Sequence, residues 1–437
     1  MADEASPTGQ LQDEREPHAA RENTVNLESA TWVPLRWPAE WRDTSLLEAV
    51  AGAGVNCLLF DQSADLAAVR ARAAELGFHV LDSAQLPPDV HVVRGEWPGI
   101  RISRQGAEAV AGPTGDPWYD SNAWRVRLAR LLHPGKRVWV SANLPDRVVL
   151  PHEFEVAAAD SALAGGRLIL TPHKDFRAWD SLGQTLRFFS THAAWAEWKT
   201  RAVLGVVSTF TGKDEAFASE LLNLTGRTHQ PCRIVPAEAP IPPLAAAIYA
   251  DGRPDAALRT RLLAYVKAGG LLVVTNRWGA GEGAHVNPYS IKYRIPITDA
   301  WSGATATALP GHPRFELYKI GLGRLAVSVD AAPDPYQLSA DTQVLMSHRH
   351  DPLRFWNAGS LGSHLSGAPT GGALLQLVNY AARPGADPVT VRVRGAFRGA
   401  RLLGPGTPPQ SVRSRPVADA LELYLPPIAT YAGIELT

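Results

Sequence analysis

Short apolar runs alternate with helical patterns from residue 31 onward, and this alternation limits the fold more than any other feature of the chain. TWVPLRW (31–37), NCLLFD (56–61) and FHVLD (78–82) are typical of strands. TSLLEAVAGAGV (44–55) and DLAAVRARAAELG (65–77) have helical spacing and end at or near glycines, as helices often do. A strand–helix–strand–helix–strand order within so short a segment predicts parallel strands.

The same alternation continues, less regularly, to about residue 200. Further strands are predicted at VHVVRGEW (90–97), KRVWVSANL (136–144) and RLILTP (167–172). Further helices are predicted at WRVRLARLL (124–132), EFEVAAADSALAGG (153–166) and LGQTLRFFSTHAAWAEWK (182–199). We therefore predict an α/β fold in which residues 29–200 form a (β/α) TIM-like barrel. Because this segment is shorter than the usual ~250 residues, we expect a truncated or partly open barrel.

Two more regions follow the predicted barrel, and a polar tail precedes it. Residues 201–345 repeat the alternation and predict a flavodoxin-like α/β domain, with a hairpin at FELYKIGLGRLAVSV (315–329). No G-x-G-x-x-G motif follows its first strand, and no cofactor is expected. In residues 346–437 the last helical pattern is GGALLQLVNYA (371–381), and the rest predicts a small C-terminal β-sandwich. Residues 1–28 are expected to be a disordered tail.

Charge and hydropathy exclude several classes of partner. The 43 basic residues balance the 43 acidic ones, and no block of Lys or Arg offers a stripe for phosphates, so no nucleic acid is expected. No apolar run reaches the ~20 residues of a spanning helix, so no membrane partner is expected. Cys57 and Cys232 lie in apolar runs and should be buried thiols. The absence of a signal peptide predicts a cytoplasmic protein as the sequence stands, or a secreted or periplasmic one if a signal was removed.

The order of the three regions, together with several motifs, resembles glycoside hydrolases of the family 42 β-galactosidase type. LLAYVKAGGLLVVT (262–275) is similar to a helix–strand unit of their amidotransferase-like middle domain, which mediates trimerisation. LRFWNAGSLG (353–362), ALLQLVNYA (373–381), LELYLPPIATYAGIEL (421–436) and GPTGDPWYDSNAW (112–124) resemble segments of bacterial barrel proteins commonly labelled glycosidases. The resemblance covers most of residues 30–437. It implies a carbohydrate substrate or ligand and a homo-oligomer formed through the middle domain.

The chain departs from that family at the positions that carry its chemistry. A barrel hydrolase of this type would have an Asn-Glu pair at the end of its fourth strand, and the chain contains no Asn-Glu dipeptide. The family's acid/base and nucleophile therefore cannot be assigned by motif. The amidotransferase cysteine is missing as well, because the corresponding strand end reads VVTNRWG (273–279).

Candidate catalytic residues come instead from the ends of the predicted barrel strands, where such barrels place their functional groups. Glycoside hydrolysis needs two carboxylates, one of which holds a proton near neutral pH. Glu96 is the first candidate because it ends an apolar strand beside Trp97; Asp120 is the second and Asp61 the third. The alternative for each is a solvated strand-end acid or a helix cap. Candidate substrate-binding residues are Arg36, Trp37, Trp97, Trp118, Tyr119, Asn122, Asn143, His173 and Asp175.

The segment GPTGDPWYDSNAW (112–124) combines turn residues with aromatic ones. Asp120 or Ser121 could cap the helix that starts near Asn122. Capping does not explain Trp118, Tyr119 and Trp124, whose flat rings beside polar groups would suit sugar rings at the barrel mouth. The alternative is that these rings fill the mouth as core.

One other cluster, His348, His350 and Asp351, has the residue types of a metal site. Arg349 lies among them and would repel a cation, so a structural polar network is favoured and no metal is expected. The sequence thus predicts a glycoside hydrolase that uses a carboxylate pair at the barrel mouth. The missing Asn-Glu pair and the short barrel favour the alternative, a non-catalytic carbohydrate-binding or assembly protein on a degenerate glycosidase scaffold.

Overall fold

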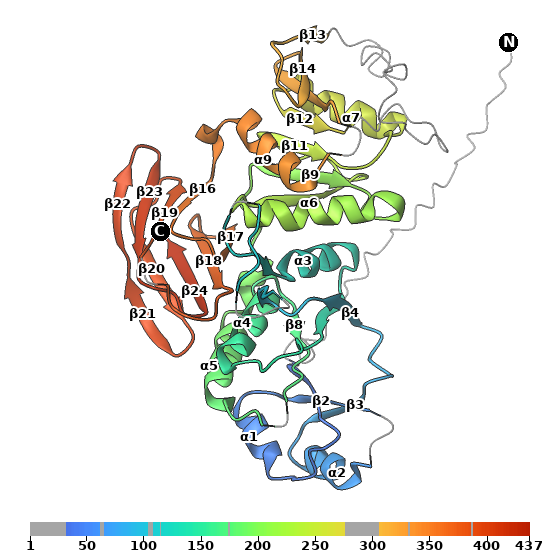
Figure 1. Ribbon diagram of the computed structural model, residues 1–437, viewed down its shortest axis with the longest axis vertical. Helices are drawn as coiled ribbons and strands as arrows, with labels where there is room; N and C mark the ends of the chain where they lie inside the picture. The colour runs from blue at the N-terminus through green and yellow to red at the C-terminus, as the bar shows by residue number, and fades with distance from the viewer. Residues whose placement is uncertain are drawn as a thin grey trace, which may run out of the picture.

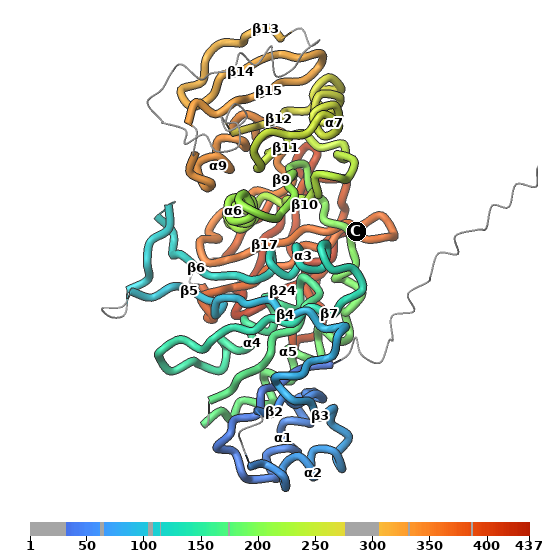
Figure 2. The backbone as a smooth tube through the Cα atoms, turned by 90° about the vertical axis from the view of Figure 1, so that its right-hand side faces the viewer, coloured from blue at the N-terminus to red at the C-terminus, as the bar shows by residue number. Residues whose placement is uncertain are grey.

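The computed structural model describes residues 32–61, 65–103, 108–113, 115–173, 175–275, 306–330, 333–385 and 388–437. Two α/β regions lie one above the other, and a β-sandwich packs beside the junction between them (Figures 1 and 2). The chain is thus mixed α/β with several sheets, as the sequence predicts. The polar tail predicted at residues 1–28 and the strand end at residues 276–279 lie outside the described residues.

Parallel strands and flanking helices make up the first α/β region. Its strands are β1 (Pro34–Arg36), β2 (Cys57–Phe60), β3 (His79–Asp82), β4 (Val90–Gly95), β7 (Arg137–Ala142) and β8 (Arg167–Leu168). A short hairpin of β5 (Gly99–Ile100) and β6 (Tyr119–Asp120) follows β4. The helices are α1 (Leu46–Gly52), α2 (Ala67–Glu75), α3 (Ala123–Leu132), α4 (Pro151–Ala162) and α5 (Trp179–Thr191), with a short 3-10 helix at Ala193–Glu197.

The six parallel strands follow one another around a partly closed sheet. β1-β2-β3 and β4-β7-β8 form two ladders, and a parallel bridge between Leu35 and Leu170 joins them. The spatial order is therefore β3-β2-β1-β8-β7-β4. The strand that comes last in the chain, β8, lies beside the strand that comes first, β1, as in a barrel. Among the described residues no ladder joins β3 to β4. The loop between these two strands has no helix to cover it.

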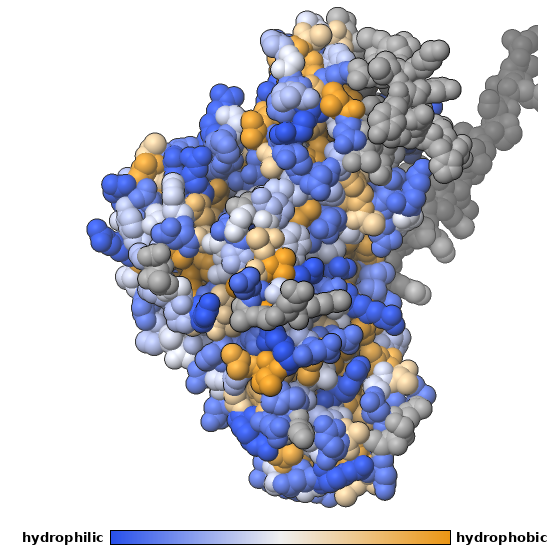
Figure 3. Space-filling view, in the orientation of Figure 1, coloured by the Kyte–Doolittle hydropathy of each residue, from blue (hydrophilic) through white to orange (hydrophobic). Residues whose placement is uncertain are grey.

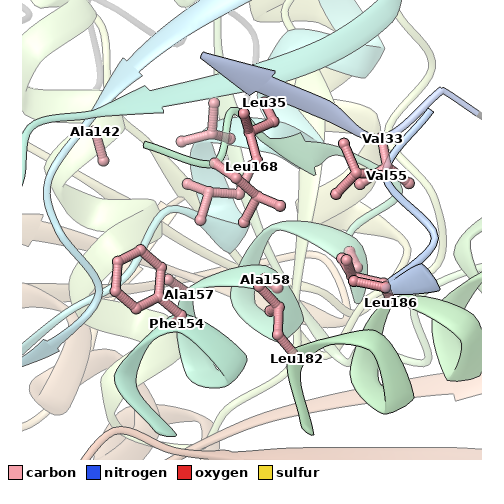
Figure 4. Packing of buried hydrophobic residues seen from close by; sticks show 14 of the residues in the cluster. Val33, Leu35, Val55, Ala142, Phe154, Ala157, Ala158, Leu168, Leu182 and Leu186 are labelled. Carbon is pink, nitrogen blue, oxygen red and sulfur yellow. The ribbon is translucent and has the colours of Figure 1, made fainter. Parts of the chain in front are cut away.

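Side-chain alternation along these strands separates an interior from an outer layer. Cys57, Leu59, Trp139 and Ile169 form the interior cluster. Their strand neighbours point the other way and pack against α4 and α5, where Leu35 and Leu168 meet Phe154, Ala158 and Leu182 (Figure 4). The interior is thus filled by side chains, as the packed core of a barrel is.

A seven-stranded sheet forms the second α/β region, in the order β10-β9-β11-β12-β15-β14-β13. Its strands are β9 (Leu204–Ser208), β10 (Cys232–Pro236), β11 (Ala246–Tyr249), β12 (Leu271–Val274), β13 (Ala306–Ala308), β14 (Phe315–Ile320) and β15 (Gly323–Ser328). The five parallel strands β10-β9-β11-β12-β15 have the chain order 2-1-3-4-5, which flavodoxin-type sheets have. α6 (Glu215–Arg227) and α9 (Pro335–Met346) cover one face, and α7 (Ala256–Lys267) covers the other. The predicted hairpin is present as β14 and β15.

Two antiparallel sheets around one apolar core make up the C-terminal region. The four-stranded sheet contains β16 (Leu353–Trp356), β19 (Val389–Arg394), β23 (Ala420–Leu425) and β22 (Arg413–Val417). The five-stranded sheet contains β17 (Leu361–Gly367), β18 (Ala373–Asn379), β24 (Tyr431–Leu436), β20 (Ala400–Gly404) and β21 (Thr407–Ser411). The helical pattern predicted at 371–381 is wrong, because residues 373–379 form the fully buried strand β18. An unbroken apolar run buried on both faces has no period that distinguishes a strand from a helix.

The face in Figure 3 is mostly polar, and the two cysteine thiols are buried. Within the described ranges, no helix combines the length and apolarity that a bilayer crossing requires. Polar residues cover most of the face in Figure 3, with small apolar patches between them. Cys57 and Cys232 are buried, as predicted, and burial raises the pKa of each thiol to about 12.

Candidate functional site

Strand register brings four side chains into one row at the carboxyl edge of the barrel-like sheet. The bridge of Leu35 with Leu170 places Arg36 level with Thr171. The β7–β8 register, continued three residues beyond its last pair, places Thr171 level with Asn143, and the β4–β7 register places Asn143 level with Glu96. We call Arg36, Thr171, Asn143 and Glu96 the mouth row. Neighbouring strands lie about 5 Å apart, so each member is close to the next.

Alternation shows that the mouth row points to the interior side. Thr171 is two residues beyond Ile169, and Asn143 is four residues beyond Trp139; both Ile169 and Trp139 belong to the interior cluster. Glu96 and Asn143 are exposed, whereas Arg36 and Thr171 are partly buried. The Nε of Arg36 is buried and has no hydrogen-bond partner among the described residues. The row therefore presents a carboxylate, an amide, a hydroxyl and a guanidinium to one mouth.

A buried asparagine fixes the backbone at Glu96. The Glu96 N–H donates to Asn122 Oδ1 at 3.1 Å, and Asn122 Nδ2 donates to the Glu96 carbonyl oxygen at 2.8 Å. A Cβ at Gly95 would lie 2.3 Å from Asn122 Oδ1, so only glycine fits before Glu96. Asn122 was predicted to bind substrate, but its side chain is fully buried and holds the strand end instead.

Asp61 lies at the same edge, one layer further out. Leu59 pairs with Arg36, so Asp61 stands two residues beyond that level on the strand next to β1. Its carboxylate is exposed and accepts a hydrogen bond from Ser83 Oγ at 2.5 Å. His173 follows β8 beyond Thr171, and its Nδ1 accepts from the Asp175 N–H at 3.3 Å. Arg36, Asp61, Glu96, Asn143 and His173 thus all come from carboxyl ends of the barrel strands.

Asp120 lies away from this row, in the β5–β6 hairpin. Its carboxylate accepts from Arg101 Nε at 3.1 Å and from Arg101 Nη2 at 2.8 Å. Trp118 Nε1 adds a third hydrogen bond at 3.2 Å. This pairing raises the pKa of Arg101 above its ordinary value. The N-cap residue of α3 is Asn122, whose own side chain makes no capping hydrogen bond, whereas Ser121 Oγ accepts from the Ala123 N–H at 3.4 Å.

Several aromatic side chains that were predicted to line a sugar-sized mouth are packed elsewhere. Trp37 is 1% exposed and its Nε1 donates to the Trp41 carbonyl oxygen at 2.9 Å. Trp97 packs edge-on against Phe154 in the outer layer. Tyr119 stacks on Tyr380 of the C-terminal region at 4.3 Å between ring centroids, and Trp124 is buried in the core of the seven-stranded sheet. Tyr119 and Trp124 are thus buried between regions distant in the chain, and neither ring fills the barrel mouth as core.

A buried polar cluster that no sequence pattern predicted joins these regions. Asp160 on α4 accepts from Tyr380 Oη at 2.6 Å, Ser121 Oγ at 2.7 Å and the Asn122 N–H at 2.8 Å. Asp160 is fully buried, and burial raises the pKa of its carboxyl group although these hydrogen bonds oppose the shift. The available signal was a lone aspartate within the alanine-rich helix EVAAADSA (155–162), since such a helix is buried on most sides.

The cluster of His348, His350 and Asp351 forms internal hydrogen bonds. His348 Nδ1 lies 2.9 Å from Asp351 Oδ2, and Arg349 Nε donates to His350 Nε2 at 3.1 Å. In the part of the chain that the structure describes, no group of three or more His, Cys, Asp or Glu side chains is arranged to hold a metal ion.

Two histidines, the buried His364 and the partly buried His229, should make the fold sensitive to acid. Burial lowers the pKa of His229 to about 4, and it lowers the pKa of His364 well below its ordinary value. A lowered folded-state pKa means that the unfolded chain binds protons first, so stability is present above about pH 6.5 and is lost as pH falls toward 4. We expect the free energy of unfolding to fall by about 1.4 kcal/mol per pH unit for each histidine in that window.

Urea titrations between pH 7.5 and 5 measure this dependence. The variant His229→Asn/His364→Gln should show a shallower pH slope than the wild type. Asparagine is chosen at 229 because it tolerates the left-handed φ of 57° there. An unchanged slope in the double variant would show that other groups cause the acid sensitivity.

Comparisons with known proteins support the fold class. No protein-family model matches the sequence, and no curated protein matches it. A rhamnosidase from Novosphingobium sp. PP1Y is similar at 12% identity with a TM-score of 0.50, over 91% of this chain and 38% of that one. An α-L-fucosidase from Paenibacillus thiaminolyticus (11%, TM-score 0.49) aligns over 90% of this chain and 79% of that one. A GH42 β-galactosidase from G. stearothermophilus (12%, TM-score 0.47) aligns over 75% and 59%.

The likeness to the rhamnosidase defines a class of fold. At 12% identity, the similarity to the rhamnosidase shows a glycoside-hydrolase-like fold and nothing finer. The resemblance to glycoside hydrolases that the sequence predicts is confirmed at that level. The chain spans only 38% of the rhamnosidase and 59% of the galactosidase.

Proposed function

We propose that the chain is a glycoside hydrolase that acts on a glycan through carboxylates at its barrel mouth, with Glu96 as the proton-transferring group. The observation that best supports this is the register of β1, β8, β7 and β4, which sets an exposed carboxylate beside an amide on the inward edge of the sheet. The backbone of Glu96 is held by Asn122, and a positioned carboxyl group is what proton transfer to a glycosidic oxygen requires.

We propose Asp61 as the second carboxylate; three strands separate β2 from β4 in the sheet, so the mechanism requires the curvature of the sheet to bring the two strand ends toward each other across the mouth. In such a pair, one protonated carboxyl group donates its proton to the leaving glycosidic oxygen as the C–O bond breaks. The other, ionised, attacks the sugar carbon or deprotonates the attacking water. We propose Glu96 as the residue that transfers the proton to the leaving oxygen and Asp61 as its partner. Asp120 positions the β5–β6 hairpin, since its oxygens are already bound by Arg101 and Trp118.

Polar groups around the pair would bind the sugar hydroxyls. Asn143 stands next to Glu96 in the mouth row, and Arg36 has a buried Nε without a partner in the described part of the chain. His173 and Asp175 lie beyond the row on the loop after β8. These groups supply both hydrogen-bond donors and acceptors, which a hydroxyl-rich ligand needs. No step of this proposal uses a cofactor.

The second candidate function is carbohydrate binding or assembly without catalysis. Two observations favour it: the described residues contain no ladder between β3 and β4, and Trp37 and Tyr119 are packed in the core. A sugar site without these aromatic rings would depend on polar contacts alone. In this reading the seven-stranded region could also join copies of the chain, as the resemblance to trimeric galactosidases suggests.

A panel of nitrophenyl glycosides separates the two functions. The panel should include rhamnosides, fucosides and galactosides, because the similar structures carry those names. Hydrolysis of at least one substrate by the purified protein is the expected result. A protein that binds immobilised glycans but cleaves none would support the second function, and a protein that does neither would contradict both.

A further inference from the structure

A hollow away from the mouth row lies where the three regions meet. It has a volume of about 670 Å³. Its walls include Trp118 and Tyr119 from the β5–β6 hairpin, Arg227 and His229 from the end of α6, Tyr336 from α9 and Phe355 from β16. We call this hollow the junction groove. Its volume falls within the range typical of sites for small ligands.

Arg227 is the unusual group in the junction groove. Its guanidinium carbon lies 3.9 Å from the ring centroid of Trp118 and 4.7 Å from that of Tyr119. Its Nε is buried without a hydrogen-bond partner. Within the described ranges no hydrogen bond or ion pair to Arg227 is found. Arg227 as a whole is partly buried, but its Nε is shielded from solvent without the hydrogen bond that such a group ordinarily makes.

The surrounding charges do not neutralise Arg227. The carboxylate of Asp120 already accepts hydrogen bonds from Nε and Nη2 of Arg101. Glu220 exerts only a weak long-range attraction on Arg227. Asp116 also lines the groove. Its Oδ1 lies close to Gly359, 2.6 Å from the position that a Cβ on Gly359 would occupy. His229 stacks on Phe355 and is neutral at pH 7, because burial lowers its pKa to about 4. The groove thus contains a guanidinium with donors to spare.

We propose that the junction groove binds the oxyanion of a small acidic ligand, of sugar-acid size, through Arg227. A planar guanidinium offers paired N–H donors that match a carboxylate, sulfate or phosphate. Stacking on Trp118 and Tyr119 holds the guanidinium plane in place before the ligand arrives, so little side-chain entropy is lost on binding. The groove's aromatic walls and its polar groups can accommodate the remainder of a sugar. This binding site is distinct from the mouth row and does not depend on hydrolysis.

Isothermal titration calorimetry with three probes tests the proposal. Sodium glucuronate, glucose and sodium sulfate are each titrated into the full-length wild-type protein at constant ionic strength. We expect glucuronate to bind at least tenfold more tightly than glucose. Sulfate binding weaker than glucuronate binding supports a sugar acid as the ligand, and equal binding supports a free inorganic oxyanion at the same group.

Two variants and a matched control complete the test. Arg227→Gln should weaken glucuronate binding roughly 10- to 100-fold, the cost of losing a charge-assisted hydrogen-bonded pair. Arg227→Lys keeps the charge without the planar donors and should lie between; it replaces the glutamine variant if that variant does not fold. Arg125→Gln is the control, because Arg125 also stacks on a tryptophan and has a buried unpartnered Nε but does not line the groove. The absence of wild-type binding at millimolar glucuronate overturns the proposal, as does equal affinity for glucose or unchanged affinity in both Arg227 variants.

Discussion

Replacing Glu96 by glutamine is expected to lower the rate of glycoside hydrolysis by about 10²- to 10⁴-fold, the usual contribution of a positioned general acid. Glutamine has nearly the same shape but cannot donate a proton to the leaving oxygen. The side chain is exposed, and the hydrogen bonds that hold this position come from the backbone of residue 96 to Asn122. The variant should therefore fold with a melting temperature close to that of the wild type.

The measurement is kcat/KM on the best substrate of the glycoside panel, together with a thermal unfolding curve. Glu75→Gln is the matched control, because Glu75 is an exposed acid at the end of α2 whose carboxylate pairs with Arg72 at the surface. Such pairs contribute little to stability. Full activity in Glu96→Gln would exclude Glu96 as the acid, and a loss of equal size in Glu75→Gln would show that the effect is not local.

The ends of the strands could be predicted from the sequence, because they depend on local patterns. The alternation of apolar strands and amphipathic helices placed Asp61, Glu96 and Asn143 at strand ends, and the structure has them directly after β2, β4 and β7. The mouth row itself needed register, which depends on which strands pair. The pairing of β8 with β1 joins residues 135 apart in the chain, at Leu35 and Leu170.

The packing partners of the aromatic segment at 112–124 could not be predicted from the sequence. Turn residues and aromatic rings indicate that a segment packs against other parts of the protein, but they do not indicate which parts. Tyr119 Oη donates to the Leu361 carbonyl oxygen, and Tyr119 stacks on Tyr380, both in a region that follows some 240 residues later. Trp124 enters the core of the seven-stranded sheet in the same way. A single sequence carries no signal for such contacts between regions, so a sugar-binding and a structural role for these rings could not be separated.

Asp160, which accepts hydrogen bonds from that segment, gives the second large expected effect, which is on stability. Replacing Asp160 by alanine is expected to lower the free energy of unfolding by about 3 kcal/mol, since it leaves a buried N–H and two hydroxyls without their shared acceptor. The N–H belongs to Asn122 and the hydroxyls to Ser121 and Tyr380. Because Tyr380 lies in the C-terminal region and Asp160 on α4, the loss should also loosen the contact between those regions. Urea unfolding at pH 7 measures the first effect, and hydrogen exchange at residues 119–123 measures the second.

Asp160→Asn is the control that separates hydrogen bonding from charge. The amide oxygen can still accept from the Asn122 N–H, and the amide carries no charge to desolvate. Burial raises the pKa of Asp160 in the folded protein, so its stabilising contribution is complete below the unfolded pKa of about 4 and declines as pH rises through the folded pKa. The wild type should therefore lose stability relative to Asp160→Asn as pH increases from 4, whereas Asp160→Ala should be less stable than both at every pH. If alanine and asparagine proved equally stable, the acceptor at residue 160 would not be what holds the segment at 119–123 in place.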